Sequence, residues 1–306
     1  MSGTAELARL YSAIEESAQL VDAACSRDKV WPILTTYGDA LAQAVIAFRV
    51  ATGARRAGEL DCRFTMLPKE VDPYALALAN GLTTETGHPV DALLADISER
   101  FPIDCYGIDF GVVEGFKKTW SFFPPDDLQE LSRLAGIPSM PRSLAANLDF
   151  FSRHGLAHNA SLIGIDYQHR TANLYFGEIP AECFEPKTIL SILREIGLPD
   201  PSEQMLRLGE IAFGIYTTLG WESSKIERIT FAVMTQDPTA LPIRLEPKIE
   251  QFVRSAPYAY DAADRRFVYA VTSSNDGEYY KLQSYYQWRP QMLDLMLLSD
   301  SAEDLV

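Results

Sequence analysis

The stretch 278-EYYKLQSYYQW-288 alternates like a strand whose two faces meet different surroundings. One face carries Tyr279, Lys281, Gln283 and Tyr285, and the other carries Tyr280, Leu282, Ser284 and Tyr286. The second face is the more apolar one and is expected to pack under helices, so Lys281 is predicted to point into an enclosed space. The preceding stretch 265-RRFVYAVTSS-274 has the same period, and together the two predict a hairpin.

Four more strand pairs of this kind lie upstream. They are 43-QAVIAFRVATG-53 with 59-ELDCRFTML-67, 104-DCYGIDFGVV-113 with 115-GFKKTWSFF-123, 161-SLIGIDYQ-168 with 170-RTANLYFGEI-179, and 211-IAFGIYTTL-219 with 225-KIERITFAVM-234. The five turns fall near residues 56, 114, 169, 222 and 276, a spacing of 53 to 58 residues. A period of this size indicates a repeat architecture.

Amphipathic helical stretches separate the hairpins, at 89–101, 126–136, 144–155 and 187–197. The repeating unit is therefore helix, strand, strand, helix. Ten antiparallel strands in one sheet tend to curl and close, which removes exposed edges. The sequence predicts an α+β fold: a ten-stranded antiparallel β-barrel built from five αββα repeats, with helices outside and a solvent-accessible lumen. We expect residues 1–306 to form one domain.

Composition narrows the function classes. The chain of 306 residues has a formal net charge of −15, which argues against binding nucleic acid or an anionic membrane surface. Its four cysteines are far apart and show no metal-binding spacing. The N-terminal stretch lacks the apolar core of a signal peptide, and no run of residues is apolar enough to span a bilayer. We expect a cytoplasmic monomer.

The inward faces of the predicted strands carry cations. They are Arg49, Arg63, Lys118, Arg228 and Lys281, with His169 in register, against one obvious carboxylate, Asp61. Lys117 and Lys118 are adjacent, so we expect one of them to point inward, and Lys118 shares its face with Trp120 and Phe122. Enclosed charges of one sign repel unless a counter-ion arrives, so a multiply charged anion such as a diphosphate is the expected ligand. The alternative is that these cations pair with carboxylates at the barrel rims.

Aromatic side chains lie between the cations on these faces: Trp120, Tyr175, Tyr216 and Tyr285. Such rings favour a ligand whose remaining part is apolar or aromatic, or becomes cationic during a reaction.

Several long segments resemble the ABBA-barrel (PT-barrel) aromatic prenyltransferases, and most of all the members that geranylate hydroxynaphthalenes in naphterpin-type biosynthesis. They are 86-TGHPVDALLAD-96, 115-GFKKTWSFFP-124, 137-IPSMP-141, 173-NLYF-176, 257-PYAYD-261 and 278-EYYKLQSYY-286. The fold of that family agrees with the repeat described above. The resemblance implies transfer of a prenyl group from its diphosphate to a ring carbon of an aromatic acceptor, with release of diphosphate.

The resemblance also implies roles for individual residues. The prenyl diphosphate would be held by Lys118, Asn173, Tyr216, Arg228 and Lys281. Tyr175 would position the prenyl chain, Tyr285 would line the acceptor pocket, and Asp61 matches an aspartate that helps to bind Mg²⁺. Departures from the family's pattern are Arg49 and Arg63 in place of serines, His169 in place of lysine, Trp120 in place of tyrosine, and, around the acceptor pocket, Ser161, Gly214 and Gln283.

These departures lead to expectations about the chemistry. Arg63 is two residues from Asp61 on one face, close enough to pair with it, and a guanidinium can hold phosphate oxygens as Mg²⁺ does. We therefore expect Arg49, Arg63 and His169 to add to the diphosphate site and no cofactor to be required; Mg²⁺ bound at Asp61 is the alternative. The allylic cation would lie against Trp120, Tyr175 and Tyr216.

The identity of the substrates stays open at this stage. The small side chains at positions 161 and 214 favour a roomy acceptor site and a geranyl donor, with dimethylallyl as the alternative. The favoured acceptor is a flaviolin-like hydroxynaphthalene, and a phenazine or a hydroxybenzoate is the alternative. The alternative from a different functional class is a barrel that binds an isoprenoid or a polyketide without catalysis.

Overall fold

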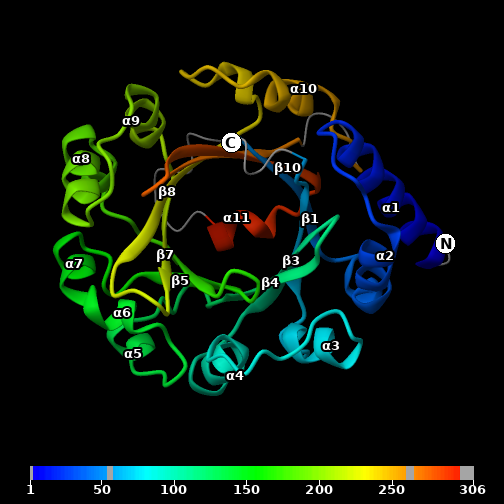
Figure 1. Ribbon diagram of the computed structural model, residues 1–306, viewed down its shortest axis with the longest axis horizontal. Helices are drawn as coiled ribbons and strands as arrows, with labels where there is room; N and C mark the ends of the chain where they lie inside the picture. Colours follow the sequence, from blue (N-terminus) through cyan, green and yellow to red (C-terminus); the bar gives the residue numbers. More distant parts are fainter. Residues whose placement is uncertain (1–2, 54–57, 260–264, 297–306) are drawn as a thin grey trace.

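A closed ring of ten antiparallel strands forms the centre of the molecule, as the computed structural model shows for residues 3–53, 58–259 and 265–296 (Figure 1). The order around the ring is β1-β10-β9-β8-β7-β6-β5-β4-β3-β2, so every strand pairs with its neighbour in sequence and β10 closes on β1. The strands are β1 (Val45–Ala51), β2 (Asp61–Leu67), β3 (Cys105–Gly111), β4 (Gly115–Phe122), β5 (Ala160–Asp166), β6 (Thr171–Phe176), β7 (Gly214–Gly220), β8 (Ile226–Thr235), β9 (Phe267–Ser274) and β10 (Gly277–Gln287).

Helices surround the ring, apart from the last one, which Figure 1 shows inside it. The α-helices are α1 (Gly3–Gln19), α2 (Arg27–Thr36), α3 (Pro73–Ala79), α4 (Val90–Arg100), α5 (Leu131–Ala135), α6 (Arg142–Ala146), α7 (Leu148–Arg153), α8 (Pro186–Glu195), α9 (Glu203–Glu210), α10 (Pro247–Ser255) and α11 (Gln291–Met296). Short 3₁₀ turns lie at η1 (Gly38–Ala40), η3 (Ala181–Phe184) and η4 (Pro238–Ala240). The main core fills the layer between the outer helices and the barrel, where residues such as Phe48, Phe110 and Phe231 are fully buried.

The barrel has two unlike ends. At one end the two strands of each pair, such as β3 and β4, are joined directly by a turn, and we call this the hairpin end. At the other end, the helix end, helices connect one pair to the next, and α11 follows β10 there. A strand rises by about 3.3 Å per residue, so the four residues from Lys281 to Tyr285 separate the two levels by about 13 Å.

The predicted fold class and the five strand pairs are confirmed, but two helix predictions were partly wrong. The stretch 126–136 is helical only from Leu131, because the backbone of Gln129 pairs with that of Ala160 in β5. The stretch 144–155 is divided into α6 and α7 at Asn147, whose Nδ2 donates to the carbonyl oxygens of Ser143 (2.7 Å) and Ser224 (2.8 Å).

Both lysines of the pair Lys117–Lys118 reach carboxylates of the barrel, contrary to the expectation that only one would point inward. The register of β3 and β4 shifts so that Asp109 faces Lys118 and Phe110 faces Phe116. Lys117 is the extra residue of this β-bulge, and a bulge changes the direction of side chains that would otherwise alternate.

Some predictions fall outside the described residues. They concern the turn near residue 56 and the positions Tyr260 and Asp261 of the segment 257–261. In the part of the chain that the structure describes, no helix is long and apolar enough to cross a bilayer. That the chain is one domain stays a prediction.

Candidate active site

A cavity occupies the lumen and encloses about 930 Å³, the solvent at its mouth included. Its lining includes these residues that the sequence predicted for the site: Arg49, Arg63, Trp120, Ser161, Tyr175, Gly214, Tyr216, Lys281, Gln283 and Tyr285. The other predicted residues, Asp61, Lys118, His169, Asn173 and Arg228, do not line this cavity and lie near the hairpin end.

Two arginines of the hairpin end are held by two aspartates. Arg49 Nη2 donates to Asp61 Oδ2 (2.6 Å), and Arg49 Nη1 lies 3.3 Å from Asp109 Oδ2. Arg63 Nε and Nη2 donate to Asp109 Oδ1 (2.7 Å) and Oδ2 (3.0 Å), so both oxygens of one buried carboxylate face one guanidinium. The expectation that Arg63 pairs with Asp61 was therefore wrong, because Asp61 lies opposite Arg49 in the β1–β2 register and Asp109 lies opposite Arg63 in the β2–β3 register.

The two lysines of the bulge have separate partners. Lys117 Nζ donates to Asp61 Oδ1 (2.8 Å), and Lys118 Nζ lies 2.8 Å from Asp166 Oδ2. Asp166 also accepts from the backbone N–H of His169 (2.8 Å), and the His169 ring lies 3.1 Å from its Oδ2. The His169 side chain is 59% exposed, so it stands at the outside of the hairpin end, behind Asp166.

Three aromatic rings form a continuous belt across the lumen wall, and we call Trp120, Tyr175 and Tyr216 the aromatic belt. Tyr175 stacks on Tyr216 with 4.3 Å between ring centroids, and Trp120 meets Tyr175 edge to face at 5.3 Å. A cation ends the belt on each side, since the Arg63 guanidinium lies 4.1 Å from the Trp120 ring centroid and Lys281 Nζ lies 5.5 Å from that of Tyr216. A carbocation is attracted to the face of an aromatic ring, so rings of this belt suit a ligand that becomes cationic.

Two further cations remain available for a ligand. Within the described residues neither Lys281 nor Arg228 makes an ion pair, and Lys281 Nζ donates only a long hydrogen bond, 3.4 Å, to the hydroxyl of Tyr216. Arg228 Nε is buried without a hydrogen-bond partner. An unpaired buried donor costs free energy, so an arriving anion that accepts from it is stabilised. Asn173 lies nearby in the sheet. Its Oδ1 accepts from Thr218 Oγ1 (2.7 Å), and Thr218 lies opposite Arg228 on the next strand.

The helix end of the cavity is apolar. A second, smaller core cluster fills it, with Ala47, Phe122, Leu162, Met292 and Leu295 among its members. The thioethers of α11 face polar lumen groups, because Thr65 Oγ1 lies 3.7 Å from Met292 Sδ and the Tyr285 hydroxyl 3.5 Å from Met296 Sδ. This end suits an apolar or aromatic group.

Charges of the hairpin end set the protonation of its groups. Burial alone would raise the pKa of Asp61 and of Asp166, but Arg49 with Lys117, and Lys118 with His169, hold these pKa values well below the ordinary range. Burial lowers the pKa of Lys118, which Asp166 offsets in part. Burial would raise the pKa of Tyr216, but the Lys281 ammonium lowers it below its ordinary value. Burial raises the pKa of Tyr285 to about 12, so this phenol is not a base at neutral pH.

Asp61 is poorly suited to bind a metal ion. Both of its oxygens already accept from cations, Arg49 and Lys117. No cluster of three or more His, Cys, Asp or Glu side chains that would hold a metal occurs in residues 3–53, 58–259 and 265–296.

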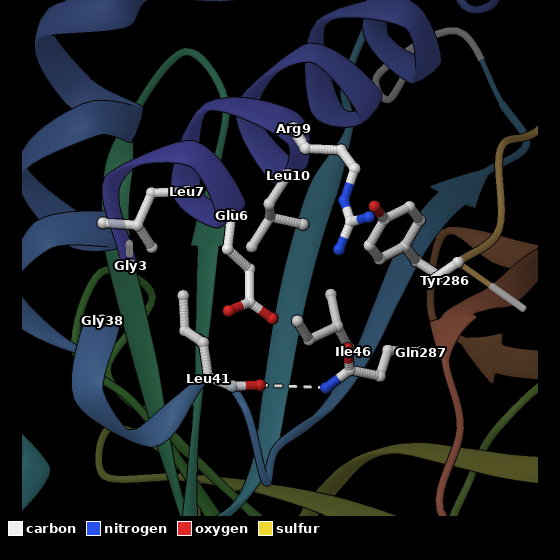
Figure 2. A pocket seen from close by; sticks show the side chains of 11 residues that line it. Gly3, Glu6, Leu7, Arg9, Leu10, Gly38, Leu41, Ile46, Tyr286 and Gln287 are labelled. Atoms are coloured by element: carbon white, nitrogen blue, oxygen red, sulfur yellow. Dashed lines mark hydrogen bonds between the residues drawn. The ribbon is translucent and has the colours of Figure 1, made fainter. Parts of the chain in front are cut away.

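A second hollow, of about 660 Å³ with its solvent, lies outside the barrel between α1 and β1 (Figure 2). Glu6 and Arg9 of α1 border it, together with Ile46 and Tyr286. On its floor Gln287 Nε2 donates to the carbonyl oxygen of Leu41 (2.9 Å). None of the site residues predicted from the sequence lines this hollow.

Sequence reasoning missed three charged residues of the hairpin end: Asp109, Lys117 and Asp166. Alternation would have found Asp109, since Tyr106, Ile108 and Phe110 occupy the apolar face of β3. Lys117 depends on a bulge, which the sequence pattern does not reveal. The cation excess is therefore smaller than predicted, although Lys281 and Arg228 still carry no ion pair in the described part of the chain.

Comparison with known proteins agrees with this site. A family model described as "Aromatic prenyltransferase Orf2" matches residues 5–294. The chain is 55% identical to 5,10-dihydrophenazine-1-carboxylate 9-dimethylallyltransferase of Streptomyces anulatus, over 98% of this chain and 100% of that protein. It is 55% identical to flaviolin linalyltransferase of Streptomyces virginiae (94% and 95% covered) and 53% identical to the furaquinocin biosynthesis prenyltransferase of Streptomyces sp. strain KO-3988 (93% and 91% covered). The cation-lined end, the aromatic belt and the apolar end thus belong to an enzyme, and the chain is a member of the aromatic prenyltransferase family.

Proposed function

We propose that this enzyme transfers a geranyl group from geranyl diphosphate to a ring carbon of a flaviolin-like hydroxynaphthalene, with release of diphosphate. The observation that carries the proposal is the polarity of the lumen: cations without an ion-pair partner among the described residues at the hairpin end, the aromatic belt in the middle and an apolar space at the helix end. The leaving group, the allylic cation and the acceptor ring each have a matching region.

The reaction proceeds as an electrophilic aromatic substitution. As the allylic C–O bond breaks, Lys281, Arg228, Arg63 and Arg49 stabilise the charge that develops on the diphosphate. The allylic cation lies against Tyr175 and Tyr216, and enclosure keeps water from capturing it. A ring carbon of the acceptor attacks the cation, and the proton on that carbon then leaves to water or to the released diphosphate.

We further propose that catalysis requires no divalent metal. Arg49 and Lys117 occupy both oxygens of Asp61, and the guanidiniums of Arg49 and Arg63 supply the positive charge that a metal ion would bring. Activity that is lost in EDTA and returns only with Mg²⁺ would contradict this.

A second candidate is dimethylallyl transfer to a phenazine. It is favoured by the relative that transfers dimethylallyl to a dihydrophenazine carboxylate, which matches nearly the whole chain at 55% identity. The flaviolin relative has the same identity, so the level of identity does not separate the two acceptors.

A matrix of two donors and two acceptors tests both candidates. Purified protein is incubated in EDTA with geranyl or dimethylallyl diphosphate and with flaviolin or dihydrophenazine-1-carboxylate, and products are identified by mass. We expect the highest kcat/KM for geranyl diphosphate with flaviolin. A higher value for dimethylallyl diphosphate with the phenazine would replace the first candidate by the second, and binding without turnover would refute both.

A further inference from the structure

Asp109 makes more contacts to the site than any role assigned so far requires. Its carboxylate is 1% exposed and lies on β3. It accepts from Arg63 through both oxygens, at 2.7 and 3.0 Å, and from the indole Nε1 of Trp120 at 2.9 Å. Arg63 and Trp120 are therefore fixed by the same carboxylate.

The Trp120 ring has room in the barrel because the residues beside it on both neighbouring strands have no side chain. Its two cross-strand neighbours are both glycines, Gly107 on β3 and Gly164 on β5. A methyl group built on Gly164 would lie 2.3 Å from the Trp120 ring, so the ring lies directly over this glycine. The ring is thus confined by β5 and oriented by its hydrogen bond to Asp109.

Arg63 completes the arrangement by lying 4.1 Å from the centroid of that ring. Its guanidinium is held in two ways at once, by the two hydrogen bonds that it donates to Asp109 and by the face of Trp120. A guanidinium has five N–H donors, and Asp109 uses Nε–H and one N–H of Nη2. The remaining donors are free of this carboxylate and belong to a side chain that lines the cavity.

We propose that Asp109 and Trp120 form a clamp that positions the Arg63 guanidinium for the departing diphosphate. Trp120 then acts mainly on Arg63, and shielding of the allylic cation is left to Tyr175 and Tyr216. The inference rests on the proposed function, since Arg63 is taken as a diphosphate ligand. A preorganised guanidinium needs no reorganisation when charge develops, which is where electrostatic catalysis gains most.

Chemical rescue tests the clamp directly. In Arg63→Ala the Asp109 carboxylate and the Trp120 indole remain, and they form a site in which free guanidinium can bind. We expect Arg63→Ala to lower kcat/KM for the prenyl diphosphate by about 100-fold, and millimolar guanidinium chloride to restore about tenfold. Methylammonium chloride at the same concentration controls for ionic strength and should restore little, because it lacks the planar two-point geometry.

Two double variants decide whether Asp109 and Trp120 form the binding site for the added guanidinium. Guanidinium should not rescue Arg63→Ala combined with Asp109→Asn, nor Arg63→Ala combined with Trp120→Leu. Asp109→Asn should also lower kcat/KM much less in the Arg63→Ala background than in the wild type, because most of its effect passes through Arg63 and only the part that passes through Arg49, 3.3 Å away, remains. Full rescue in either double variant, or additive losses, would overturn the proposal. Folding of each variant is checked by its Tm, and the Trp120 variant serves if the Asp109 variant is unstable.

A surface pair provides a matched control. Arg194 donates to Asp200 with the same two-point geometry, both distances being 2.9 Å, but both side chains are 61% exposed. Asp200→Asn should leave kcat/KM and rescue unchanged. If the wild-type protein transfers no prenyl group, the proposed function fails, and the same comparison is then made with the Kd of inorganic diphosphate. If Arg63→Ala weakens diphosphate binding, and guanidinium restores the binding only when Asp109 and Trp120 are both present, the clamp is still supported. If Arg63→Ala leaves the binding unchanged, the clamp is overturned.

Discussion

The two ends of the lumen are built from the same ten strands but differ in the charge of the side chains that line them. At the hairpin end, buried cations meet three buried carboxylates, while Lys281 and Arg228 have no carboxylate partner among the described residues. At the helix end, methionine and aliphatic side chains close the space. Position along the strands thus separates charged from apolar surroundings, and under the proposed function it would separate the leaving diphosphate from the acceptor ring.

Turnover should suffer most from removal of a cation that makes no ion pair within the described part of the chain. Lys281→Ala and Arg228→Ala should each lower kcat by about 10²–10³-fold, since each removes charge that stabilises the developing diphosphate. The free energy of unfolding should change little, because no buried carboxylate loses its partner. Diphosphate release and urea unfolding measure the two quantities.

Lys248→Ala is the control for this prediction, because Lys248 pairs with Asp22 on the surface. Wild-type rates in both lumen variants would remove the functional distinction between the two ends.

The paired charges of the hairpin end should matter more for stability. Asp166→Asn leaves the buried Lys118 ammonium without its carboxylate and should lower the free energy of unfolding by about 3 kcal/mol. Asp200→Asn breaks an exposed pair and should cost about 0–1 kcal/mol. Urea denaturation of the two variants at pH 7 gives the comparison, and equal losses would contradict it.

Two glycines of the barrel strands, Gly164 on β5 and Gly214 on β7, differ in the space around them. Gly164→Ala should cost about 2 kcal/mol, because the added methyl group overlaps the Trp120 ring. A methyl group on Gly214 meets nothing within 4 Å, so Gly214→Ala should keep its stability and change mainly the KM of the acceptor. Thermal unfolding and acceptor titrations separate the two, and a stable Gly164→Ala would show that the Trp120 ring is free to move.

The smallest effect concerns pH. Burial lowers the pKa of Lys118 below its ordinary value of 10.5, so the free enzyme loses this charge at a lower pH than an exposed lysine would. With increasing pH, the KM of the prenyl diphosphate should therefore rise, and the rise should begin at a pH below 10.5. Lys118→Arg keeps its charge and should move this alkaline limb upward. Profiles of kcat/KM from pH 7 to 10 measure it, and coincident limbs would exclude Lys118.

Much of the site was predictable because a strand has a period of two. Alternation in β10 alone placed Lys281, Gln283 and Tyr285 on the lumen side, where all three line the cavity. The same reasoning failed at Lys117, since a bulge interrupts the alternation. It also placed His169 in register with the site, whereas the turn after β5 holds His169 outside, against Asp166.

The five hairpins, the barrel and the inward face of most strands could be predicted from local patterns, since alternation and turn residues act over a few positions. The family followed from the resemblance of longer segments. Which charges pair could not be read from these patterns. Arg63 meets Asp109 and Arg49 meets Asp61 because cross-strand register sets which side chains approach within hydrogen-bond distance, and register depends on bulges and strand pairing along the whole barrel.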